Sequence, residues 1–154
     1  MLRARYLLAL LMVLIIAGLA VAAEQPLYDE KADAHQQVSA ALAKAARAGK
    51  NIILIFGANW CPDCHALDAQ MHKGDLAALI AEDFVIVNVD VGRHDKNLDL
   101  AEKYKIPIEH GIPALAVLDQ HGKILHAMDQ GQFADARHMS YESIRAFFVK
   151  WQRR

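Results

Sequence analysis

The stretch NIILIFGANWCPDCH, residues 51–65, joins an apolar run to the two cysteines of the chain. Residues 51–56 are continuously apolar after the first position and rich in β-branched side chains, which predicts a strand buried on both faces and therefore central in a sheet. Residues 57–59 turn the chain. Pro62 suits the first turn of a helix, because its missing N–H would lack a partner there anyway. The stretch therefore predicts a strand, a turn and a helix that begins at the cysteines.

The rest of the chain alternates between helical and strand patterns. Helices are predicted over residues 29–50, 62–72, 76–81 and 97–104 and after an N-cap at Ser140, and strands over residues 51–56, 84–90, 114–118 and 123–128, with a hairpin turn at 119–122. This order predicts an α/β fold, in which a central mixed sheet of four to five strands is flanked by helices on both faces.

Residues 1–23 have the pattern of a secretory leader. Two arginines precede an uninterrupted apolar run over residues 6–23, and the polar Glu24 follows small residues. We expect cleavage before Glu24 and export to the periplasm, which leaves one domain over residues 24–154. An uncleaved membrane anchor is the alternative, because the length of the run approaches the roughly 20 residues of a spanning helix.

Charge and cysteine content narrow the class of function. Two of the 17 basic residues lie in the leader and none of the 18 acidic ones does, so 15 basic residues remain against 18 acidic ones. No basic block indicates nucleic acid as a partner. The two cysteines are too close to each other to link distant parts of an exported fold, so we expect them to serve chemistry.

The motif WCPDCH, residues 60–65, has a redox interpretation that follows from its place at a helix start. Unpaired N–H groups and the positive end of the helix dipole favour the thiolate of a cysteine there. Cys61 has that position and is expected at an exposed tip, while Cys64 points inward one turn deeper. Cys61 would attack a client disulfide, and Cys64 would resolve the mixed disulfide.

A family resemblance supports this interpretation. Residues 56–67 resemble the active-site segment of the thioredoxin superfamily, and are similar to exported thioredoxin-like proteins and to the C-terminal domain of the thiol-disulfide interchange protein DsbD. Residues 111–113, followed by an apolar strand and an Asp-x-x-Gly-Lys turn, resemble the second family signature. The resemblance spans roughly residues 29–151. It implies the thioredoxin fold and a protein-disulfide oxidoreductase that needs no bound cofactor.

The resemblance also implies roles for residues around the cysteines. Pro113 would be a cis proline facing the cysteine pair, Ile112 a backbone contact to the client, and Trp60 a platform at the rim, although a lone aromatic is more often core packing. Pro62 and Asp63, between the cysteines, complete the expected client-binding surface. The implied partners are proteins with disulfides or oxidised thiols, and a membrane electron donor that restores the reduced form.

The sequence departs from thioredoxin at Asp63. A carboxylate at ~6 Å from Cys61 opposes its ionisation by on the order of 1–3 kcal/mol at an effective dielectric constant of ~20. The helix end favours the thiolate by ~0.3–1 kcal/mol. A weakly stabilised thiolate favours a reductase over a strong oxidant. An Asp63 side chain turned into solvent would weaken this inference.

A second departure concerns proton transfer at the resolving cysteine. Thioredoxin has a buried aspartate six residues before its first cysteine, and Ile55 occupies that position here. We therefore expect Glu109, His110 or water to exchange the proton of Cys64, with solvated loop residues as the plainer interpretation of both side chains.

Two other chemistries remain open for the motif. CxxCH is also a haem attachment pattern, with His65 and Met71, Met128 or Met139 as possible iron ligands. Four strand-like runs and a strand directly before Cys61 disfavour a small cytochrome. Soft ligands would suit Cu(I) or Zn(II), held by Cys61, Cys64, His65 and a distant histidine. Because Cys64 and His65 point in different directions on a helix, a closed site from these three is strained.

Overall fold

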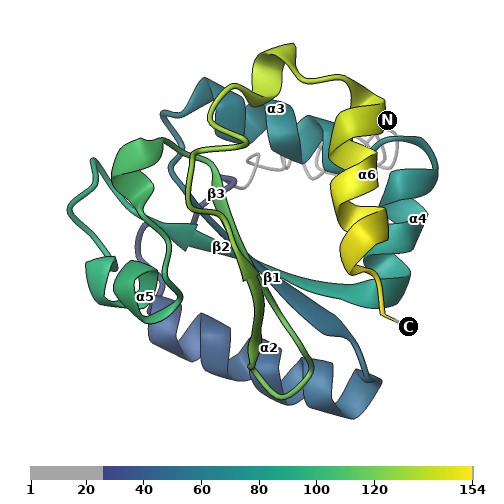
Figure 1. Cartoon of the computed structure of the whole chain (residues 1–154). Coiled ribbons are helices and arrows are strands. Elements are labelled where there is room, and N and C mark those ends of the chain that lie inside the picture. Colours follow the sequence, from purple (N-terminus) through teal and green to yellow (C-terminus); the bar gives the residue numbers. More distant parts are fainter. Residues whose placement is uncertain (1–25, 154) are drawn as a thin grey trace, which may run out of the picture.

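The computed structural model describes residues 26–153, so the predicted leader lies outside the described residues. Within this part, no helix is both long and apolar enough to span a membrane. The elements are the helices α2 (Ala34–Ala48), α3 (Pro62–Met71), α4 (Gly74–Asp83), α5 (Leu98–Lys103) and α6 (Tyr141–Trp151), the 3-10 turns η1 (Ile108–His110) and η2 (Ala136–His138), and the strands β1 (Asn51–Gly57), β2 (Phe84–Asp90), β3 (Ala114–Leu118) and β4 (Ile124–Ala127) (Figure 1).

The described residues form one mixed sheet of four strands in the order β2-β1-β3-β4. β1 runs parallel to β2 and antiparallel to β3, and β4 pairs antiparallel with β3. The predicted central place of β1 is therefore confirmed, as is the hairpin that ends the sheet. The mixed sheet with helices on both faces is the thioredoxin fold.

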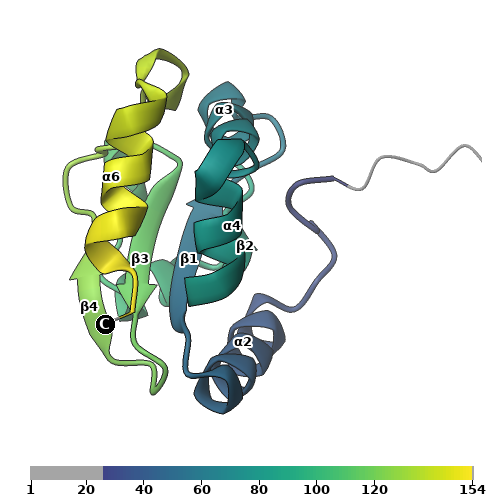
Figure 2. The same cartoon turned by 90° about the vertical axis from the view of Figure 1, so that its right-hand side faces the viewer.

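Alternate side chains of β1 enter two separate cores. Ile52, Leu54 and Phe56 pack with residues of α2 and α5. Ile53 and Ile55 pack with residues of α3, α4 and α6. Figures 1 and 2 show these two helical layers on opposite faces of the sheet. A strand that is apolar at every position thus supplies both cores.

One edge of the sheet gathers the segments of the candidate site. Gly57 at the end of β1 pairs with Asp90 at the end of the parallel strand β2. Phe56 pairs with Ala114, the first residue of the antiparallel strand β3. The cysteine motif after β1, the loop after β2 and the proline before β3 therefore meet at the same edge.

The first helix begins later than the sequence pattern indicated. Its N-cap is Asp33, whose carboxylate accepts the N–H of Gln36. The predicted helical start at residue 29 is wrong, because this cap sets the first turn. Residues 27–33 instead form an irregular segment, called here the N-terminal strap. Asn88 of β2 binds it by donating from its side-chain amide to the Leu27 carbonyl, 3.0 Å.

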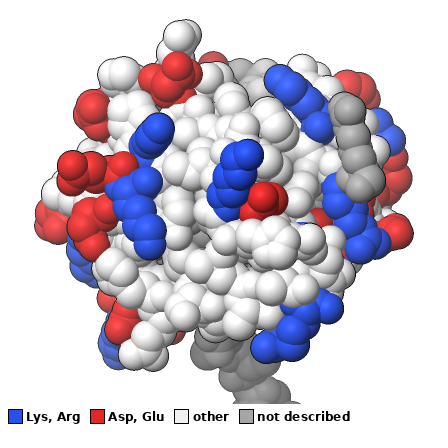
Figure 3. All heavy atoms as spheres, turned by 60° about the horizontal axis from the view of Figure 1, so that its bottom comes forward, with Lys and Arg blue, Asp and Glu red and all other residues white. Residues whose placement is uncertain are grey.

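The surface has no dominant sign of charge on the face shown in Figure 3. Acidic and basic side chains are interspersed around a largely uncharged centre. This arrangement agrees with the near balance of 17 basic and 18 acidic residues in the sequence, and gives that face no field that would attract a polyanion.

Candidate active site

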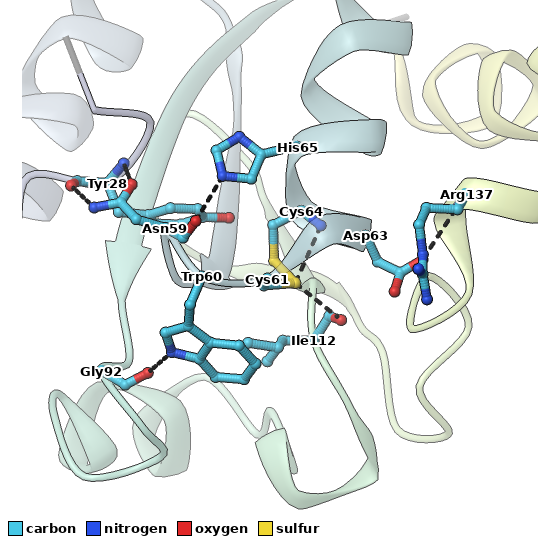
Figure 4. The surroundings of a disulfide bond; sticks show 10 residues. All are labelled: Tyr28, Asn59, Trp60, Cys61, Asp63, Cys64, His65, Gly92, Ile112 and Arg137. Carbon is cyan, nitrogen blue, oxygen red and sulfur yellow. Dashed lines mark hydrogen bonds and ion pairs between the residues drawn. A yellow bond between two sulfur atoms is a disulfide. The ribbon is translucent and has the colours of Figure 1, made fainter.

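Cys61 and Cys64 form a disulfide at the start of α3, with their Cα atoms 5.3 Å apart. Cys61 is the N-cap of the helix and Pro62 is its first residue. The backbone N–H of Cys64 donates to the Cys61 sulfur over 3.1 Å (Figure 4). The predicted placement of the pair at a helix start is confirmed. A thiolate on Cys61 would receive this N–H and the positive end of the helix dipole.

The predicted exposure of Cys61 is wrong. Cys61 is 3% exposed and Cys64 1%, so both are buried in the disulfide form. The segment before β3 covers Cys61: the Ile112 carbonyl oxygen lies 3.6 Å from its sulfur. The Ile112–Pro113 peptide bond is cis, as the resemblance implied. Local sequence did not reveal this cover, because it comes from a loop about fifty positions away.

Trp60 lies beside the disulfide at the surface, where it is 48% exposed. Its indole N–H donates to the Gly92 carbonyl over 2.7 Å. Its ring lies edge-on to His94, and the Arg93 guanidinium lies 5.8 Å from its centroid. The loop after β2 therefore holds the indole in place, and the alternative of core packing does not apply.

Asp63 is buried and paired, rather than turned into solvent. Its Oδ1 accepts the backbone N–H of Arg137 over 3.0 Å and the guanidinium Nε–H over 3.1 Å. Burial opposes the ionised carboxyl, but these two hydrogen bonds and the positive charge of Arg137 outweigh burial and lower the pKa of Asp63. The charge beside Cys61 is thus balanced by a residue that sequence reasoning missed.

On the opposite side of the disulfide, Tyr28 of the N-terminal strap lies against Gly57. A Cβ on Gly57 would lie 2.8 Å from the Cys64 sulfur and closer still to the Tyr28 hydroxyl. The hydroxyl and the sulfur are therefore neighbours. Burial, and then the charges of Asp68 and Asp90, raise the pKa of Tyr28. The hydroxyl stays protonated at physiological pH and is available as a donor.

Asn59 ties the strap to the cysteine motif. Its side chain accepts the Tyr28 N–H over 2.9 Å and donates to the Tyr28 carbonyl over 2.8 Å. The backbone carbonyl of Asn59 accepts a hydrogen bond from His65 Nε2, 2.7 Å away. These contacts fix the strap beside the disulfide (Figure 4). An asparagine within the Phe56–Trp60 turn gave no sequence signal for this pairing.

Glu109 and His110 lie in η1, and both are exposed. His110 Nδ1 bonds to the Asp129 carbonyl over 2.7 Å. Neither residue borders the narrow cavity beside Cys64, which Tyr28, Asp68 and Asn88 line with polar groups. Ile55 is buried and also lines this cavity. A role of Glu109 or His110 in proton transfer therefore stays a prediction.

Comparison with known proteins identifies the family. Residues 33–120 match the family described as thioredoxin-like. The chain belongs to the thioredoxin-like family. A solved structure titled as a disulphide isomerase from Xylella fastidiosa Temecula1 is 46% identical, with a TM-score of 0.79 over 83% of this chain and 98% of that one.

Two further matches are more distant. A rice protein (Oryza sativa subsp. japonica) named "Probable nucleoredoxin 3" is 30% identical over 95 residues, 49% of this chain and 20% of that protein. The chain thus spans about a fifth of that curated relative. The oxidised C-terminal domain of DsbD from Neisseria meningitidis shares the fold, with 16% identity and a TM-score of 0.52 over 79% of this chain and 97% of that domain.

The family, the disulfide-bonded CxxC pair and the 46% identical relative define the general chemistry. The chain is a thiol-disulfide oxidoreductase with the thioredoxin fold.

Proposed function

We propose that this protein reduces disulfides in client proteins outside the cytoplasm, with Cys61 as the nucleophile and Cys64 as the resolving thiol. The observation that carries the proposal is the position of the Cys61 sulfur. It caps a helix, accepts the Cys64 N–H and adjoins the exposed Trp60. The Cys64 sulfur instead borders the core, beside Ile55 and Leu67.

The proposed exchange has two steps. The Cys61 thiolate attacks one sulfur of a client disulfide, so a Cys61–client bond forms while the client bond breaks and its other sulfur leaves as a thiolate. Cys64 then loses its proton to solvent and attacks the Cys61 sulfur. The Cys61–Cys64 disulfide forms, the second client sulfur leaves, and each client thiolate takes a proton from solvent. Two electrons pass from the protein to the client.

The surroundings of Cys61 support the reducing direction. One N–H and the helix end favour its thiolate, the latter by ~0.3–1 kcal/mol. The Ile112 carbonyl oxygen, 3.6 Å from the sulfur, opposes a negative charge there. Arg137 pairs with Asp63, so Asp63 opposes the thiolate less, and supports the reducing direction less, than the sequence suggested. A modestly stabilised thiolate favours a reduction potential towards the reducing end of the family.

The client-binding surface in this proposal is the rim around the disulfide. Trp60 supplies an exposed aromatic surface, and the Ile112–Pro113 segment supplies backbone groups beside Cys61. Pro62 and the Asp63 side of the helix start complete the rim. An extended client segment laid across it would bring a disulfide to Cys61.

Export and electron supply extend the proposal. The leader pattern of residues 1–23 supports a periplasmic location. Disulfides persist there, so a reducing pair needs continual re-reduction. A membrane electron carrier is the expected donor.

Matched single-cysteine variants test the proposal. Cys61→Ser is expected to abolish insulin reduction, and Cys64→Ser is expected to accumulate mixed disulfides with clients in extracts of the producing cells. Each variant removes one thiol, so each is the control for the other. If Cys64→Ser traps nothing while the wild-type chain binds Cu(I) tightly, a copper-handling function replaces this proposal. A haem absorption band in protein from cells that assemble cytochromes c would replace it with a haem function.

A reduction potential measured against glutathione tests the direction. The proposal predicts a value near the roughly −270 mV of thioredoxin. A value near the roughly −180 mV of protein disulfide isomerase would leave the exchange chemistry intact and overturn the reducing direction.

A further inference from the structure

The resolving step requires a negative charge on a buried sulfur. Cys64 is 1% exposed, and burial disfavours its thiolate. The strand position at which thioredoxin has an aspartate holds Ile55, which borders the same cavity as Cys64. Asp68 also borders it, and its negative charge opposes a thiolate. Stabilisation of the Cys64 thiolate must therefore come from another group.

The Tyr28 hydroxyl is a polar donor placed beside this sulfur, whereas Asn88, which lines the same cavity, donates its side-chain N–H to the Leu27 carbonyl. Both groups pack on the bare Cα of Gly57, where a Cβ would contact each of them at less than 3 Å. The Tyr28 side chain is 1% exposed, and two hydrogen bonds to Asn59 hold its backbone. Its ring position is thus fixed by the core and by the strap, and this holds the hydroxyl beside the sulfur that becomes the Cys64 thiolate.

We propose that the Tyr28 hydroxyl donates a hydrogen bond to the Cys64 thiolate and acts as a positioning residue for the resolving step. This inference rests on the proposed function. In the mixed disulfide, the Cys64 proton passes to solvent and the Tyr28 O–H stabilises the sulfur anion that remains. That anion attacks Cys61 and the client thiolate departs. Tyr28 keeps its own proton throughout, so it neither accepts nor supplies one.

The charged groups near this hydroxyl come from two other elements. Asp68 lies on α3 and Asp90 ends β2. Asp90 is paired with Lys96 over 2.9 Å. These groups are unchanged when only the Tyr28 hydroxyl is removed. A displaced pH profile in a Tyr28→Phe variant therefore reports the lost hydrogen bond.

The test follows the resolving step alone. Reduced full-length protein is treated with dithiobis-nitrobenzoate at acid pH, where Cys64 stays protonated, to form the mixed disulfide at Cys61. A rapid jump to higher pH then starts release of the coloured thiolate by Cys64. The release rate is recorded against pH for the wild type, for Tyr28→Phe and for Tyr104→Phe. Tyr104 is a buried tyrosine of the same core that does not line the cavity beside Cys64.

In Tyr28→Phe, we expect the midpoint of the release rate against pH to lie at a higher pH than in the wild type. The two profiles of rate against pH should therefore cross. Loss of a hydrogen bond to a charged group raises the midpoint of the pH profile by about one pH unit or more in Tyr28→Phe. A more basic thiolate is a better nucleophile, so a midpoint that is higher by one pH unit makes release about threefold slower below the midpoint and about threefold faster above it. Tyr104→Phe keeps the wild-type midpoint.

Two results would overturn the inference. An unchanged midpoint in Tyr28→Phe, with normal release in the wild type, refutes the role of Tyr28 and leaves the proposed function standing. Absence of release in the wild type at every pH refutes the proposed function and the role of Tyr28 with it. A purely structural role predicts a lower melting temperature in Tyr28→Phe with an unchanged midpoint.

Discussion

The two sulfurs of one disulfide lie in different surroundings although they are one helical turn apart. Cys61 contacts backbone groups, an N–H on one side and the Ile112 carbonyl on the other, next to the exposed Trp60. Cys64 borders the core and the Tyr28 hydroxyl. Exposure differs little, at 3% and 1%. The division of labour therefore depends on which groups each sulfur meets, more than on depth.

Gly57→Ala, which alters the surroundings of the Cys64 sulfur, should have the largest effect on stability. The new methyl group would lie 2.8 Å from the Cys64 sulfur and closer to the Tyr28 hydroxyl. We expect the free energy of unfolding to fall by about 3 kcal/mol, the upper end for overpacking, as measured by urea denaturation.

A double variant tests whether a clash with the Tyr28 hydroxyl causes this loss of stability. In Gly57→Ala combined with Tyr28→Phe, removal of the hydroxyl relieves the shortest of the contacts that the methyl group would make, so the pair should cost less than the sum of the single changes. Strict additivity would show that the methyl group does not meet the Tyr28 hydroxyl.

Arg137→Ala should disturb the Cys61 side by a smaller amount. It removes the guanidinium from Asp63 and leaves the backbone N–H. We expect a loss of about 1–2 kcal/mol of stability at neutral pH and a higher pKa of Cys61, measured by thiolate absorbance. Arg145→Ala, which breaks the exposed pair with Asp75, is the control and should leave the Cys61 pKa unchanged.

The stability lost in Arg137→Ala should depend on pH in a defined direction. The folded-state pKa of Asp63 is lowered, so its pairing stabilises the fold above the ordinary aspartate pKa of about 3.9. The stabilisation is lost as the pH falls through the lower folded-state value. Wild type and Arg137→Ala should therefore converge in stability in strong acid. A gap that persists there would contradict the ionic origin of the effect.

Trp60→Phe should have the smallest effect on stability. Of the two reactions compared, it should slow only the reaction with a protein client. It removes the hydrogen bond to Gly92 but keeps an aromatic ring at the rim. Stability should change by about 1 kcal/mol or less. Insulin reduction should slow, whereas reaction with dithiobis-nitrobenzoate, which needs no extended contact, should keep its rate. Equal slowing of both reactions would mean that Trp60 acts on Cys61 itself.

The features that sequence predicted are those with a local cause. The run over residues 51–56 is apolar at nearly every position, so a central strand followed from composition alone. Ser140 caps α6 through its side chain, as its position before the apolar stripe indicated. Pro62 suits the first turn of a helix, and this predicted that its neighbour Cys61 lies at a helix start.

The features that sequence missed depend on contacts across the fold. Tyr28 reaches the motif through Asn59, 31 positions away, and Arg137 reaches Asp63 across 74 positions. Neither pairing has a periodic or compositional signal. The burial of Cys61 likewise depends on the Ile112 carbonyl, which only the sheet register brings to the end of β1. Residues that are distant in the sequence thus supply the charged and hydrogen-bonding groups around both sulfurs.

Competitive alkylation of the reduced full-length protein tests the central claim most directly. A limiting amount of iodoacetamide is added at neutral pH, and the labelled peptides are quantified by mass spectrometry. The different surroundings of the two sulfurs predict label on Cys61 well before any appears on Cys64. Preferential labelling of Cys64, or two cysteines that both stay unlabelled, would contradict the assignment of Cys61 as the nucleophile.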